Sequence, residues 1–134
     1  MKEITIKEGD VINVTAFYFQ VPDWTDDQPC VILSPVVKYV ETNSAESAVE
    51  DFLIDLCSDE CAESDDLEDV EEALQCVGRS LSCLRKKANL SIKTGKSPYK
   101  NSYSEIISLQ VKITKDEDGL DWEAISRKEI NNEI

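Results

Sequence analysis

The chain has 134 residues, of which 41% are apolar and 31% are charged, so it is long enough and apolar enough to bury a single core. Its 28 acids and 14 bases leave a net charge of −14, which disfavours direct contact with nucleic acid or an anionic membrane and favours a basic partner. Because the longest apolar run is Cys30–Leu33 and the first residues are charged, we expect neither a membrane span nor a secretion leader, and we predict one cytoplasmic acidic domain over residues 1–134.

The N-terminal part of the chain predicts β-strands. Residues 4–6 and 11–21 are rich in β-branched and aromatic side chains, and a turn centred on Gly9 separates them. Both faces of the stretch 11–21 carry apolar residues, which favours a central place in the sheet. Pro35 interrupts a third extended stretch over residues 30–40, so this stretch predicts either two short strands or one edge strand with a bulge.

Two helices are predicted after these strands. The first begins near Asn43, which forms a capping pattern with Glu46, and its apolar positions line one face over residues 45–56. The second covers residues 67–88, where apolar residues recur at alternating steps of three and four. This apolar series consists of Leu67, Val70, Leu74, Val77, Leu81, Leu84 and Ala88.

The apolar face of the second helix has two interpretations. An ordinary helix would turn it toward the core of its own chain, whereas about three heptads also reach the lower limit for a coiled coil and would support a homodimer. Acids crowd the first turns of this helix and bases its last turns, an arrangement that stabilises a helix through its dipole. Gly78 lies within the series, costs up to ~1 kcal/mol relative to alanine, and indicates either close packing or a bend.

The C-terminal part of the chain predicts a loop, a strand and an undecided segment. Residues 93–104 are polar and contain glycine and proline, which is typical of a loop. Apolar and polar residues alternate strictly over 107–113, so the sheet is expected to have one buried and one solvated face. Residues 115–119 predict a turn, 120–126 fit either a short strand or a capped helix, and 127–134 are expected to fray.

Together these elements predict an α+β fold. The expected order is β-β-β-α-α-β, with an antiparallel sheet of about four strands and the two helices packed as a helical hairpin on one of its faces. The apolar faces of the helices would then close the buried side of the sheet.

Most arrangements that serve catalysis or cofactor binding are missing from the sequence. The chain has no histidine, hence no Ser-His or Cys-His pair, and its five cysteines lack the paired spacing of a zinc site. The segment Asp116–Gly119 has the spacing at which a calcium loop starts, but the later acidic ligands are absent, so it is interpreted as a turn. We therefore expect reduced thiols, no metal, no cofactor and no enzymatic activity; a carboxylate-dependent hydrolase is the catalytic alternative.

Charge is segregated along the chain. Residues 59–72 contain acids and no base, whereas residues 73–104 contain bases and no acid. Carboxylates held on a folded element form charge-assisted and often bidentate hydrogen bonds with arginine, and a second acidic group lies within residues 22–29. The predicted partner-binding residues are Asp59, Glu60, Glu63, Asp65, Asp66, Glu68, Asp69, Glu71 and Glu72, together with Asp23, Asp26 and Asp27.

The preferred hypothesis is a small acidic binding module or inhibitor that occupies the basic surface of a partner protein, such as a nuclease, a toxin or another nucleic-acid-binding protein, with mimicry of nucleic acid as one form of it. Toxin-immunity proteins and phage-encoded anti-restriction or anti-CRISPR proteins share this size, acidity and lack of catalytic motifs; the similarity is one of composition and involves no specific motif. The alternative is a structural homo-oligomer or complex subunit that uses the helix Leu67–Ala88 as its interface.

Overall fold

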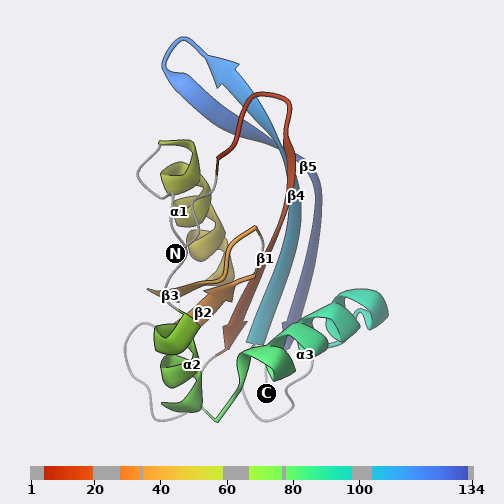
Figure 1. Cartoon of the computed structure of the whole chain (residues 1–134). Coiled ribbons are helices and arrows are strands. Elements are labelled where there is room, and N and C mark those ends of the chain that lie inside the picture. Colours follow the sequence, from red (N-terminus) through yellow and green to blue (C-terminus); the bar gives the residue numbers. More distant parts are fainter. Residues whose placement is uncertain are drawn as a thin grey trace.

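In the computed structural model, which describes residues 5–19, 28–33, 35–58, 67–76, 78–97 and 104–132, the chain folds around a five-stranded antiparallel sheet. The strands are β1 (Val11–Phe19), β2 (Gln28–Ile32), β3 (Lys38–Thr42), β4 (Ser104–Asp116) and β5 (Gly119–Asn132). The helices are α1 (Ala45–Cys57), α2 (Leu67–Cys76) and α3 (Leu81–Thr94). In space the strands follow the order β3-β2-β1-β4-β5, and the predicted α+β class is confirmed (Figure 1).

The arrangement corrects several details of the predicted topology. The sheet has five strands rather than about four: residues 5–6 of the first predicted strand are not in a strand, the stretch 30–40 divides between β2 and β3, and the undecided segment 120–126 belongs to β5. Residues 127–132, which we expected to fray, continue the same strand and pair with β4 from Ser104 to Leu109. The order along the chain is therefore β-β-β-α-α-α-β-β.

The central position predicted for the second strand is confirmed. β1 is third of the five strands and pairs with β4 along its whole length, from Val11 opposite Lys112 to Phe19 opposite Ser104. β2 and β3 are the two short strands that the prediction allowed on either side of Pro35, and they pair with each other. Proline has no amide hydrogen for a sheet ladder, which explains why the extended stretch divides there.

The expectation of one buried and one solvated face is wrong, because apolar side chains cover both faces of the sheet and each face has its own helices. Ala16, Tyr18 and Cys30 belong to a core that contains the buried face of α1, whereas Phe17 and Val31 belong to a second core with α2 and α3. Figure 1 shows α1 and α3 on opposite sides of the sheet. The predicted helical hairpin on one face is therefore wrong: successive residues of a strand point to opposite faces, so a strand that is apolar on both needs a cover on each side.

The predicted helix over residues 67–88 is two helices, because strong stop and start signals lie inside its apolar series. Gly78 adopts a left-handed backbone with φ of 74°, and its N–H donates to the carbonyl of Gln75 at 3.0 Å while the N–H of Arg79 donates to that of Leu74 at 2.9 Å. This pair of bonds is the Schellman motif, which ends a helix. Ser80 then caps α3, since its side chain accepts from the N–H of Cys83 at 3.2 Å.

The start of α1 is fixed by two oxygen acceptors. Ser44, rather than the predicted Asn43, is the N-cap, and its hydroxyl accepts from the N–H of Ser47 at 3.1 Å. Glu105 of β4 accepts from the N–H of Ala45 at 3.1 Å, which brings a negative charge to the positive end of the helix dipole and ties α1 to the sheet. Among the described residues, no helix combines the length and the apolar character that crossing a bilayer requires.

Candidate functional site

The predicted acidic site is only partly within the described structure. Glu68 and Glu72 are exposed on α2, Glu71 is half-buried there, and Asp69 belongs to the same helix. The remaining predicted residues lie outside the described residues: Asp59, Glu60, Glu63, Asp65 and Asp66 before α2, and Asp23, Asp26 and Asp27 before β2. The structure therefore describes one helix of the predicted acidic surface and leaves the rest as a prediction.

The apolar series on α2 and α3 points inward. Val70, Leu74, Leu81, Leu84 and Ala88, its described members, are all buried and pack against Phe17, Val31, Ile106 and Ile130 of the sheet. This corresponds to the first interpretation of that series, a helical face turned to the core of its own chain. An oligomer interface made of these side chains would have to expose them first.

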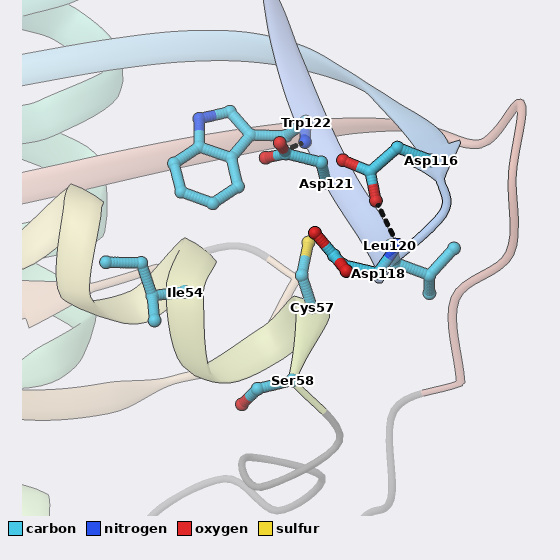
Figure 2. A pocket seen from close by; sticks show the side chains of 8 residues that line it. All are labelled: Ile54, Cys57, Ser58, Asp116, Asp118, Leu120, Asp121 and Trp122. Carbon is cyan, nitrogen blue, oxygen red and sulfur yellow. Dashed lines mark hydrogen bonds between the residues drawn. The ribbon is translucent and has the colours of Figure 1, made fainter.

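A groove that the sequence did not predict lies between α1 and the β4–β5 hairpin. One hollow of about 380 Å³ is lined by the end of α1 and by the tip of the hairpin (Figure 2). A second hollow of about 160 Å³ continues along α1 toward Arg127, and Trp122 lines both. The first hollow contains Ile54, Cys57, Ser58, Asp116, Asp118, Leu120, Asp121 and Trp122.

The groove results from the different lengths of the elements that form it. α1 has 13 residues and spans about 20 Å, whereas β5 has 14 residues and spans roughly 45 Å, so the hairpin extends past the end of the helix. Leu120 and Trp122 are therefore half-buried against the core rather than enclosed by it. Ile54 remains 53% exposed on the helical side, which gives the groove an apolar wall.

A bulge in β5 determines which residues line the second hollow. The register changes from Gln110 opposite Ser126 to Val111 opposite Ala124, so Ile125 is an extra residue in β5. A single inserted residue reverses which side chains face the helix, and it places Arg127 on the same face as Ala124. Ile125 itself is 52% exposed.

The aspartates at the hairpin tip are oriented by backbone amides. The carboxylate of Asp116 accepts from the N–H of Asp118 at 2.9 Å, and that of Asp121 accepts from the N–H of Trp122 at 2.8 Å (Figure 2). The N–H of Trp122 lies on the open edge of the sheet, because Ile113 opposite it bonds on its other side to Gly9 and Asp10, the two residues that precede β1. Asp121 thus satisfies one of the edge donors that would otherwise invite another strand.

The groove is strongly acidic. The two hollows are lined by five carboxylates and one guanidinium, those of Glu46, Glu50, Asp116, Asp118, Asp121 and Arg127. Arg127 is already engaged: it donates to Glu129 and, at 3.5 Å, to Glu46 across the groove. Its hydrogen bond to Glu129, together with the charges of Glu129 and Glu46, raises the pKa of the Arg127 guanidinium above its ordinary value.

The three hairpin aspartates differ from Glu46 in that none of them forms an ion pair among the described residues. The ion pairs of the described residues include those of Glu46, Asp55 and Glu129, and none involves Asp116, Asp118 or Asp121. Each hairpin aspartate is exposed, and no described carboxylate is buried. No group of three or more metal-ligating side chains exists among the described residues.

Sequence reasoning gave a partial signal for this groove. The calcium-like spacing of Asp116 and Asp118 predicts a turn, and the structure has that turn. Trp122 lay in the segment that was undecided between strand and helix. The pairing of α1 with a strand more than sixty residues further on depends on tertiary packing, which the local pattern does not encode.

Comparison of the chain with protein-family models, with curated proteins and with solved structures gives no match. The functional argument therefore depends on the surface of this molecule alone.

Proposed function

We propose that the chain is an acidic binding module, acting as an inhibitor or adaptor, that docks on the basic surface of a partner protein. The observation that carries the proposal is the set of exposed hairpin aspartates without ion pairs, at one end of the groove between α1 and the β4–β5 hairpin. Arginine and lysine side chains of a partner would supply the missing positive charge, and charge complementarity of this kind accelerates encounter and fixes orientation.

The exposed acids of α2 form a second acidic surface that would bind positive charge in the same way. Glu68 and Glu72 project from a helix whose opposite face is locked in the core by Val70 and Leu74, so their spacing is fixed by a packed element. Fixed carboxylates lose little conformational freedom on binding, which favours them over those on a flexible segment. The acids that precede α2 lie outside the described residues, and their part in binding stays a prediction.

The proposal places the module in the cytoplasm. Cys30, Cys76 and Cys83 carry free thiols, as is usual in a reducing compartment. The partner class in this proposal is a basic protein such as a nuclease, a toxin or another nucleic-acid-binding protein.

The test is capture of partners from a host lysate by the immobilised protein, repeated at low and high salt. A variant with Glu68→Lys, Glu71→Lys and Glu72→Lys should reduce the amount of captured partner on the order of tenfold or more, since it reverses the local field. A matched control, Glu8→Lys, Glu41→Lys and Asp51→Lys, changes the net charge equally at exposed positions elsewhere and should have a smaller effect.

Circular dichroism of both variants establishes that they are folded, and glutamine variants at the same positions replace the lysine variants where they are not. A partner whose capture is independent of salt, or is reduced equally by both variants, would contradict the proposed mode of binding.

A further inference from the structure

We infer that the groove between α1 and β5 is the recognition site for an arginine-bearing segment of the partner, with the indole of Trp122 as the surface on which the guanidinium stacks. The inference deepens the proposed function and rests on it, because it assigns one part of the acidic surface to one kind of side chain.

The shape of the groove suits a short segment with alternating character. The hollow of about 380 Å³ lies at the lower end of the range of ~300–1,000 Å³ that is common for small ligand sites, and the second hollow extends it along α1. The floor of the extension is apolar and includes Ile107 and Leu109, while the hairpin end carries the aspartates. An occupant therefore needs apolar atoms along its length and positive charge near the hairpin tip.

The aspartates and Trp122 together favour arginine over other cations. Asp121 is adjacent to Trp122 in the chain, and both line the hollow together with Asp118 (Figure 2). A guanidinium is planar, stacks on an aromatic face and donates five hydrogen bonds in its plane, so one arginine uses the indole and the carboxylates at the same time. A lysine ammonium is a compact, strongly hydrated charge that gains less from the ring.

The backbone hydrogen bonds of the aspartates favour this geometry and leave other carboxylate acceptor positions open. One oxygen of Asp116 and one of Asp121 accept a backbone N–H, which restricts how the carboxylates turn. A carboxylate has about four acceptor positions, so the other oxygens remain available for a partner. The same charge repels phosphate groups, which argues against a nucleic-acid occupant.

The experiment uses a synthetic hexapeptide, acetylated and amidated, in which three arginines alternate with three leucines. Titration into the ¹⁵N-labelled Trp24→Phe variant leaves Trp122 as the only indole of a chain that has two tryptophans. We expect a saturable shift of the Trp122 indole resonance together with shifts of Asp118, Asp121 and Ile54. The same peptide with neutral citrulline for arginine should bind at least about tenfold more weakly, the difference of ~1.4 kcal/mol that a charge-assisted hydrogen bond provides.

Variants of the groove separate charge from stacking. Asp118→Asn with Asp121→Asn should weaken peptide binding roughly tenfold, whereas Glu8→Gln with Asp51→Asn, which changes the net charge equally outside the groove, should have little effect. Trp122→Leu should remove the preference for the arginine peptide over a lysine peptide, while Trp122→Phe should retain part of it. Circular dichroism checks that the variants at position 122 are folded, and the pair of aspartate variants tests the site independently of them.

Several outcomes would overturn the inference. These are the absence of any groove shift at millimolar peptide, equal binding of the citrulline peptide, and equal weakening by the control variant. Groove shifts that follow the protein concentration without peptide would assign the groove to a second copy of the chain. A partner that the Asp118 and Asp121 variant still captures, but that is lost when the α2 acids are reversed, would overturn the assignment of the groove as the binding site. The proposed function as an acidic binding module would stand.

Discussion

Substitution of Gly78 by alanine tests the helix break between α2 and α3 through the sign of its effect. At φ of 74° a side chain other than glycine costs about 1–2 kcal/mol of backbone strain. An added Cβ meets nothing within 4 Å, so no steric clash contributes. Alanine also reduces the conformational freedom of the unfolded chain, which stabilises the folded state and offsets about 0.4–1 kcal/mol of that strain. The net prediction is a loss of about 1 kcal/mol.

A continuous helix over residues 67–88 would give the opposite result, because alanine inside a helix is more stable than glycine by up to ~1 kcal/mol. Urea denaturation followed by far-ultraviolet circular dichroism measures the difference in the free energy of unfolding. The melting temperature of Gly78→Ala should fall by about 3–5 °C, and Gly78→Asn should lose less since asparagine tolerates the left-handed region. A Gly78→Ala variant that is more stable and more helical than the wild type would refute the break.

Three further predictions concern the core, a cap and a buried thiol. Leu84→Ala should destabilise the protein by about 2–5 kcal/mol in urea denaturation because the Leu84 side chain is fully buried. Leu90→Ala removes a side chain that is 60% exposed and should change stability by less than about 0.5 kcal/mol. Similar losses in the two variants would mean that α3 does not pack as described. Ser80→Ala should lower the free energy of unfolding by about 1 kcal/mol by the same measurement, because it removes the N-cap of α3. Ser80→Asp keeps a capping oxygen and should retain most of that stability; a Ser80→Asp variant as unstable as Ser80→Ala would contradict the cap. Burial raises the pKa of the Cys30 thiol far above its ordinary value of 9.0, so the folded chain keeps a proton that the unfolded chain releases at high pH. The contribution of this thiol to the free energy of unfolding is therefore complete below pH 9.0 and declines at higher pH by up to about 1.4 kcal/mol per pH unit. The loss of stability above pH 9.0 should be smaller in Cys30→Ala, and identical profiles would show that the thiol is not buried.

The sequence predicted the fold best where a pattern is local and decided by burial. The strand over residues 107–113 and the central position of residues 11–21 follow from which faces are apolar, and the division of strands at Pro35 follows from the missing amide hydrogen of proline. The errors arose where two local signals competed. The apolar series over 67–88 continues through Gly78 and Ser80 with an unbroken period, but their capping bonds end one helix and begin another.

The candidate site was less predictable because it depends on contacts that are distant in the chain. The charge of residues 59–72 is evident from composition, yet only its last part lies in the described structure, so that surface is still a prediction. The groove is formed by α1 and β5, and its lining depends on a one-residue bulge at Ile125. A shift of one residue reverses the faces of a strand, and no pattern in the segment 119–132 marks where that shift occurs.

The central claim is that carboxylates of this protein recognise positive charge, and the most direct test is the salt dependence of the dissociation constant for the captured partner. Binding is measured by titration calorimetry from about 50 to 500 mM NaCl, a range over which the screening length falls from about 14 to 4 Å. We predict that the dissociation constant rises steeply with salt and that neutralising Asp118 and Asp121 makes this rise shallower. A dissociation constant that is independent of salt, with the same value in that variant, would contradict the account.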